Sequence, residues 1–251
     1  MKKTDKILNL ILPIITVSCL LVIWMVASVS VGSEYILPDP VKTFNELVSL
    51  FGQSNFYVAF LLTLLRSVIA FVLSFIIASV CAFLSHKSKK AEKVILTVIS
   101  ILRARPTVSI VLLLLFWTNN QVAPVVVTML VVMPTTYTHV KSAFETVDKT
   151  SIEAGMVDGA DRKQSFLKVE FPQIAPAMYS AIGSGLSLNF KLMVAAEVLS
   201  ATVKSLGNLL NIANYNGQIA KMLAMVIVAV VFGIIVEFVF NKISKRAGEW
   251  R

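Results

Sequence analysis

Long apolar runs separated by short polar intervals make up most of this chain. A helix needs about 20 predominantly apolar residues to cross the hydrocarbon layer of a bilayer. The pattern therefore predicts an all-α protein with six transmembrane helices. The predicted spans are Ile7–Val31, Val58–Leu84, a third that follows an interfacial helix at Ala91–Leu102 and continues through Pro106 to Trp117, Val122–Val140, Ile174–Leu199 and Met222–Ile243.

The interval between the first two spans predicts a short amphipathic helix on the membrane surface. Pro40 suits the first turn of such a helix. Apolar residues then recur at helical spacing: Val41, Phe44, Leu47, Val48 and Phe51. A second polar stretch on the same side of the membrane, Ala201–Lys221, is rich in Asn and Gly.

The longest polar interval, Thr150–Pro176, begins with a predicted short helix. Thr150 and Glu153 have the spacing of a capping box, so the helix can begin at Ser151 with its first amide groups satisfied. Gly159 suits its end, because glycine accepts the left-handed conformation that follows a helix C-terminus. The apolar stripe of this helix is Ile152, Met156 and Ala160.

A second short helix is predicted in the same interval. Asp161 and Gln164 repeat the capping spacing and open a helix from Arg162 to about Glu170. We expect Pro172 to stop it, because proline lacks the N–H that a helix interior needs. The interval thus displays a small capped helix between two segments of membrane-spanning length.

Composition agrees with a membrane protein. Hydrophobic residues are 57% of the 251 residues and charged residues only 15%, whereas soluble domains are about 45–50% apolar and about 25% charged. The net charge of +9 comes from basic residues that flank the apolar segments. That distribution is typical of cytoplasmic membrane anchors and argues against nucleic-acid binding. Cys19 and Cys81 both fall in apolar segments, so no disulfide framework is implied.

The distribution of Lys and Arg also predicts the orientation. Six spans place both termini on one side. If that side is the cytoplasm, most basic residues lie inside, and only Lys42, Lys204 and Lys221 lie in the outer intervals. This asymmetry satisfies the positive-inside rule. It predicts cytoplasmic termini and a cytoplasmic Thr150–Pro176 interval.

The cytoplasmic interval resembles a known motif. Glu153-Ala154-Gly155, then Gly159 after three residues, then Val169-x-Phe171-Pro172 after nine more, is similar to the EAA loop of ABC importer permeases. Gly155, Val169 and Phe171 depart from the family pattern but keep small or apolar character. In the family this loop docks in a groove on the ATPase subunit. The resemblance therefore implies an ATPase-coupling site at Glu153, Ala154, Gly155, Met156, Asp158, Gly159 and Ala160. The alternative is a loop that packs only on its own protein.

Further resemblance covers most of the chain from about Ile36 onward. It rests on Pro38 with the helix after it, Thr63-Leu64-Leu65-Arg66, Leu102-Arg103 with Pro106, and the pair Leu192-Met193-Val194-Ala195-Ala196-Glu197 and Leu206-Gly207. These motifs resemble the nitrate, sulfonate and taurine branch of the permeases. The chain departs from that branch at Ala104, Arg105 and Lys191.

The resemblance implies a type I ABC importer permease fold in the bacterial inner membrane. Residues 1–251 would form a single transmembrane permease domain with its coupling loop at about 150–172. The implied partners are two copies of an ABC ATPase, an extracytoplasmic substrate-binding protein and a second copy of this chain. No cofactor or metal is implied.

Charges inside spans are the candidate pathway residues, because ionisable groups at membrane depth must face protein or water. Arg103 and Arg105 either anchor the inner interface or face the pathway and attract an anion. Lys191 and Glu197 are six residues apart and so do not share a helical face. We expect Glu197 to hold the end of the fifth span to the Leu206-Gly207 loop, and Arg66 to snorkel to the nearby interface.

The sequence has no G-x-x-x-x-G-K-[ST] for ATP, no H-E-x-x-H and no G-x-S-x-G. We therefore predict a permease without its own ATPase motif, which uses the ATPase of a partner subunit. The substrate would be a sulfonate, nitrate or related small anion, or else a vitamin or pyrimidine precursor. Two hypotheses of other classes are a passive channel or secondary carrier, and a membrane-embedded enzyme, which the missing catalytic constellation disfavours.

Overall fold

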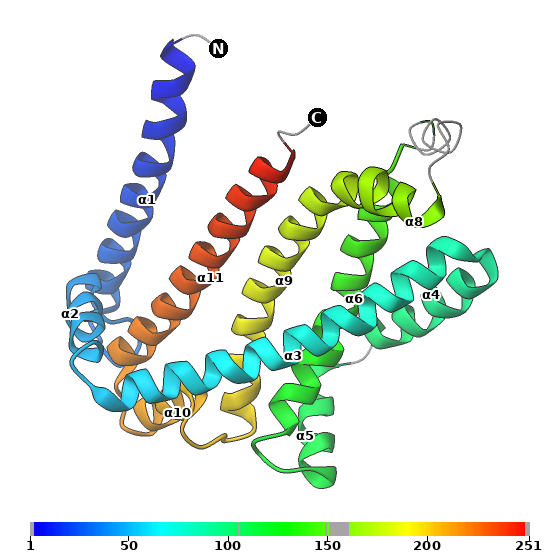
Figure 1. Ribbon diagram of the computed structural model, residues 1–251. Coiled ribbons are helices and arrows are strands. Elements are labelled where there is room, and N and C mark those ends of the chain that lie inside the picture. Colours follow the sequence, from blue (N-terminus) through cyan, green and yellow to red (C-terminus); the bar gives the residue numbers. More distant parts are fainter. Residues whose placement is uncertain (1–2, 105, 149, 151–160, 249–251) are drawn as a thin grey trace. The chain divides into compact units, whose positions relative to one another are not determined.

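The computed structural model describes residues 3–104, 106–148, 150 and 161–248. Helices account for most of them (Figure 1). The helices are α1 (Lys3–Val31), α2 (Pro40–Leu50), α3 (Ser54–Lys87), α4 (Lys89–Ala104), α5 (Thr107–Trp117), α6 (Ala123–Glu145), α8 (Arg162–Ser165), the π-helical turn η1 (Phe166–Glu170), α9 (Phe171–Leu199), α10 (Leu206–Tyr215) and α11 (Ile219–Gly248).

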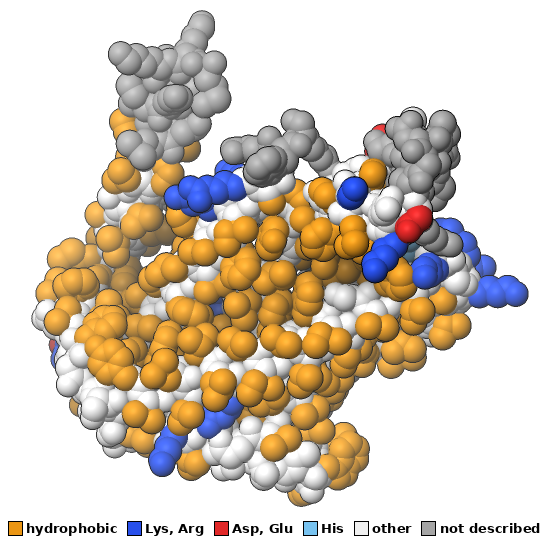
Figure 2. Space-filling model, viewed as in Figure 1, with side chains coloured by type: hydrophobic (Ala, Val, Ile, Leu, Met, Phe, Trp, Pro, Cys, Tyr) orange, Lys and Arg blue, Asp and Glu red, His pale blue; other side chains and the backbone are white. Residues whose placement is uncertain are grey.

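The predicted membrane character is confirmed. Five helices in the described part of the chain are long and apolar enough to cross a membrane, and α4 with α5 makes a sixth if that bent pair counts as one span. Hydrophobic side chains cover most of the face drawn in Figure 2, and its Lys and Arg side chains are few. Apolar side chains of α1 such as Leu20 are 61% exposed, as suits a helix surrounded by lipid.

The third predicted span is not a straight helix. The structure divides it into α4 and α5, whose axes are bent by 93°. Pro106 is extended, with φ −73° and ψ 116°. Proline cannot donate the next helical hydrogen bond, and it disfavours a helical residue before it. Helix α4 covers the predicted interfacial helix at Ala91–Leu102, and the part of the predicted span after Pro106 is the separate helix α5, so the span is bent at Pro106 and does not run straight through it.

The expected stop at Pro172 is also wrong. Asp161 caps the predicted second helix as expected, since its Oδ1 accepts from the amides of Lys163 and Gln164. The helix then passes through η1 directly into α9, giving one membrane-length helix over Lys163–Leu199. Pro172 lies in the first turn of α9, where a missing N–H is tolerated.

The stretch at 201–221 contains a helix that the sequence analysis did not predict. Helix α10 begins at Leu206, and the Ser205 hydroxyl accepts the amide of Asn208 at 2.9 Å. Its buried residues Leu206, Leu210 and Ala213 have helical spacing. The signal was present in the sequence, but the frequent Asn and Gly residues obscured it.

Contacts divide the chain into two compact units. The first consists of residues 1–57 and 209–228, and the second of residues 58–208 and 229–251. In the first unit the Trp24 indole donates to the Pro38 carbonyl, and Asp39 caps α2 through the amide of Val41. Lys42 donates to Glu34, and this hydrogen bond raises the pKa of Lys42 above its ordinary value.

In the second unit α6 packs along α9 (Figure 1). A buried cluster joins α3, α4 and α6, and its members are Ala78, Ala82, Ile99, Met133, Tyr137 and Val140. The glycines of α9 permit close approach of other helices. A Cβ placed on Gly185 would lie 2.7 Å from the Phe71 ring, and one on Gly183 would lie 2.5 Å from Phe240 Cβ. Small residues serve this purpose in membrane helix packing.

Candidate functional site

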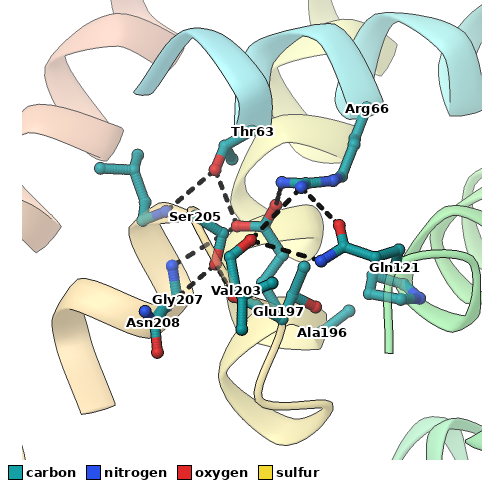
Figure 3. A network of polar contacts seen from close by, with 12 residues as sticks. Thr63, Arg66, Gln121, Ala196, Glu197, Val203, Ser205, Gly207 and Asn208 are labelled. Carbon is teal, nitrogen blue, oxygen red and sulfur yellow. Dashed lines mark hydrogen bonds and ion pairs between the residues drawn. The ribbon is translucent and has the colours of Figure 1, made fainter. Parts of the chain in front are cut away.

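A buried ion pair organises one end of α9 (Figure 3). Arg66 of α3 donates from Nη1 to Glu197 Oε1 of α9 at 3.0 Å. The Glu197 side chain is fully buried and that of Arg66 is 14% exposed. The predicted snorkelling of Arg66 is therefore wrong. Its guanidinium is held by an acid on another helix and is not free to reach the interface.

Polar groups from α3 and from two further segments complete the site around Glu197. Thr63 Oγ1 donates to Glu197 Oε2 at 2.8 Å and accepts the amide of Leu206 at 3.0 Å. The amide of Gly207 donates to Glu197 Oε2 at 3.4 Å. Arg66 Nη2 also donates to Gln121 Oε1 at 2.6 Å. The carboxylate therefore joins α3, α9 and the start of α10, and this group of residues is called the Glu197 clamp below.

The clamp explains why a glycine follows Leu206. A Cβ placed on Gly207 would lie 2.5 Å from Glu197 Cβ and 2.5 Å from the Val198 nitrogen. The backbone of α10 can therefore approach α9 only without a side chain at this position. The expected link between Glu197 and the Leu206-Gly207 loop is present in the structure.

We predict that Gly207→Ala destabilises the protein by about 1–3 kcal/mol, the usual cost of forcing extra volume into a packed site. The blocking atoms are the Val198 nitrogen and the Glu197 carbonyl carbon of the α9 backbone, together with Glu197 Cβ, whose position the backbone fixes, so none of them can rotate away. Thermal unfolding in detergent measures the effect. Gly52→Ala is the matched control, because a Cβ there meets only Ser49 O at 3.4 Å. Equal stability of the two variants would contradict the prediction.

The loop between α9 and α10 is tied to the segment before α6. Thr202 Oγ1 donates to the Asn120 carbonyl at 2.6 Å, and Asn120 Nδ2 donates to the Ala201 carbonyl at 3.3 Å. Ala201 and Lys204 hold positive φ values of 49° and 51°, which are costly for residues with side chains. Several polar contacts thus fix a strained loop beside the clamp.

A second group of charges lies near the C-terminal ends of α3 and α6 and the N-terminal end of α4. Lys141 of α6 pairs with Glu92 of α4 at 2.6 Å and with Glu145 at 3.4 Å. A cavity of about 400 Å³ lies beside them, and it is lined by Ser85, His86, Lys89, Glu92, Lys141, Phe144, Glu145 and Val147. The Glu92–Lys141 pair holds α4 against the end of α6 from which the chain enters the 150–160 stretch.

The predicted coupling residues, Glu153 to Ala160, lie outside the described residues, as does Arg105. The described residues where the chain enters the 149–160 stretch are tied to α9 and to one another. The amide of Asp148 donates to Gln173 Oε1 at 3.0 Å, and the amide of Thr150 donates to Asp148 Oδ1 at 3.0 Å. The chain therefore enters this stretch at a point tied to α9, and its described part resumes at Asp161, directly before α8.

The other predicted pathway residues are in different places. Arg103 donates to Thr138 Oγ1 and to the Pro134 carbonyl, the geometry of an anchor between α4 and α6. Lys191 is exposed on α9, away from Glu197, which lies within the clamp. The pattern along the chain did not indicate Gln121 as a partner of Arg66, nor Thr63 as a partner of Glu197. Thr63 and Arg66 are three residues apart on an apolar helix, a spacing that places them on one face and could have indicated a shared partner.

Comparison with known proteins defines the class. Residues 71–249 match the family described as "Binding-protein-dependent transport system inner membrane component". The chain belongs to this family and is an integral inner-membrane permease subunit of an ABC importer.

Two curated relatives align with nearly the whole chain. One is described as an ABC transporter permease protein of Methanocaldococcus jannaschii, 22% identical over 98% of this chain and 93% of the relative. The other is the taurine transport system permease protein TauC of Escherichia coli, 22% identical over 94% of this chain and 88% of the relative.

Solved structures share the fold. A bacterial ABC transporter involved in the import of the acidic polysaccharide alginate aligns with a TM-score of 0.62 at 16% identity, over 98% of this chain and 99% of that chain. The MetNI methionine ABC transporter in an inward-facing conformation aligns with a TM-score of 0.61 at 18% identity, over 74% of this chain and 93% of that chain. These likenesses confirm the predicted importer permease fold.

Proposed function

We propose that this chain forms the translocation pathway for a small anion such as a sulfonate or nitrate, as one half of a permease dimer driven by two copies of an ABC ATPase. An extracytoplasmic binding protein delivers the solute. The motif at Glu153–Ala160 is the docking helix for the ATPase. The observation that carries this proposal is the hydrogen bond from Asp148 to Gln173, because it ties the end of α6, where the chain enters the motif-bearing stretch, to α9.

Contacts among α4, α6 and α9 would transmit a movement of the docking helix to the membrane-spanning helices. Helices α6 and α9 pack against each other, and the Glu92–Lys141 pair fixes α4 to α6. A displacement of the docking helix would therefore move these helices together. The ATP state shifts the equilibrium between inward-open and outward-open forms only through contacts that differ between the two forms. We place those contacts at residues 153–160, with both termini in the cytoplasm.

The choice of solute rests on relatives and on charge. TauC is named for taurine, which carries a sulfonate, and Lys191 places a cation on an exposed face of α9. The alternative within the same class is a heterocyclic vitamin or its pyrimidine precursor. Binding of methanesulfonate, nitrate and thiamine to the associated binding protein would distinguish these solutes.

The test is ATP-driven uptake in proteoliposomes that contain this chain, its ATPase and its binding protein. We expect accumulation of the solute against its gradient only when ATP and all partners are present. Equilibration of solute by the purified chain alone, without ATP, would instead identify a channel or carrier and overturn the proposal.

A further inference from the structure

Lys191 is a cation within an apolar helix. It lies between Phe190 and Leu192, eight residues before the end of α9, or about 12 Å along the axis. Its side chain is exposed, and no acid among the described residues pairs with it. An exposed ammonium at such a depth is costly against lipid and is expected to face water or a charged partner.

The Lys191 side chain lies beside Gly233 of α11. A Cβ placed on Gly233 of α11 would lie 2.7 Å from Lys191 Cε and 3.3 Å from Lys191 Nζ. The same Cβ would lie 2.7 Å from Ser187 Oγ. The ammonium and the hydroxyl thus lie against one face of Gly233, a surface that any larger residue would fill.

Ser187 has an unused hydroxyl. Its side chain is fully buried, and Oγ has no hydrogen-bond partner among the described residues. Ser184, one turn earlier, shows the usual arrangement, in which the hydroxyl donates to a carbonyl of its own helix, that of Ser180 at 3.1 Å. A buried polar atom without a partner costs free energy. A ligand oxygen beside Lys191 would satisfy it.

We propose that Lys191 and Ser187, placed together over Gly233, form a binding subsite for a singly charged oxyanion in the translocation pathway. The ammonium supplies the charge, and the hydroxyl donates a hydrogen bond to a second oxygen of a sulfonate or nitrate. Gly233 leaves the space that the anion occupies once the Lys191 side chain turns aside. This inference rests on the proposed function, because it requires that this face of α9 line the pathway of an anion.

The binding test uses the full chain in nanodiscs, without ATP or partners. Lysines are reductively methylated with ¹³C, which keeps their charge, and the Lys191 signal is identified by its loss in Lys191→Met. We expect methanesulfonate to shift this signal saturably, and the uncharged dimethyl sulfone of similar shape to leave it unmoved. The subsite is overturned if Lys191 is not methylated, or if its signal does not shift with either methanesulfonate or nitrate.

The lipid content of the nanodisc separates a free anion from a lipid phosphate. Phosphatidylcholine discs should give the full response to methanesulfonate. If the signal moves only on addition of phosphatidylglycerol, the partner of Lys191 is a lipid phosphate and the proposal is overturned. If it moves only in the Glu237→Gln variant, the partner is the Glu237 carboxylate of the neighbouring helix, and the proposal is overturned as well.

Variants then measure each group. Loss of a hydrogen bond to a charged group weakens binding by about tenfold or more, and loss of one neutral donor by about threefold. We therefore expect Lys191→Met to raise the KM for methanesulfonate uptake by about tenfold and Ser187→Ala by about threefold, with Lys191→Arg near wild type. Ser184→Ala is the matched control and should change nothing.

The two proposals fail in different ways. If the wild-type complex imports the anion and Lys191→Met keeps the same KM, the subsite is wrong and the importer stands. If the complex imports nothing while the Lys191 signal still responds to methanesulfonate, the subsite is upheld and the transport proposal fails.

Discussion

Glu197→Met is expected to destabilise the protein by about 3–5 kcal/mol, the usual cost of removing one partner of a buried ion pair. The change leaves the Arg66 charge, the Thr63 hydroxyl and the Gly207 amide without their shared acceptor. Arg66→Met should have a similar effect, because it leaves the fully buried Glu197 carboxylate with an unpaired charge. Thermal or denaturant unfolding in detergent measures both variants.

The double variant Arg66→Met/Glu197→Met decides whether pairing is the cause. Replacing both members of a buried pair by apolar residues of similar size is often neutral, so the double variant should be more stable than either single one. Lys42→Met removes an exposed pair with Glu34, whose side chains are 49% and 63% exposed, and should leave stability unchanged. Additive losses in the double variant would contradict this account of the clamp.

Ala154→Glu is expected to lower ATP-driven uptake by about one to two orders of magnitude, the range of a typical coupling free energy between sites. A charged side chain would prevent the small face of the docking helix from entering the ATPase groove. Gly159→Pro should act similarly by altering the end of that helix. ATP hydrolysis should continue without responding to the binding protein, while the amount of chain in the membrane stays normal.

The control for the coupling variants is Ala247→Glu, the same change near the end of α11 on the same predicted side of the membrane. It should leave uptake unchanged. Co-purification of the ATPase with each variant supplies a second measurement, because Ala154→Glu should weaken that association. Normal uptake by Ala154→Glu would mean that the 150–160 stretch does not couple the two subunits.

The sequence predicted the spans well because their signal is local. Each membrane helix needs only its own length of apolar residues, and α2 needed only Pro40 and the apolar spacing after it. The errors came at prolines, whose effect depends on position. Pro106 separates α4 from α5, whereas Pro172 lies in a first helical turn and α9 continues past it.

The site was harder to predict, because its members are far apart in the sequence. Arg66 and Glu197 are separated by 131 positions, and no local pattern says which charges in different spans meet. Motif resemblance included Thr63, Arg66, Glu197 and Gly207 but did not indicate that they meet, and it did not include Gln121, the second partner of Arg66. The subsite at Lys191 depends on a glycine in another helix, which only the packed structure reveals.

The helix that passes through Pro172 has a thermodynamic consequence. Its 37 residues from Lys163 to Leu199 amount to about 55 Å of helical path, with the predicted coupling stretch before one end and the Glu197 clamp at the other. Under the proposed function, ATP binding rearranges the loops at the clamp end of this helix. Linkage is reciprocal, so docking of the binding protein on those loops would change the affinity for ATP by the same factor. The affinity for the binding protein outside the cell and the affinity for ATP inside it would then report the same coupling free energy, which could be measured from either side of the membrane.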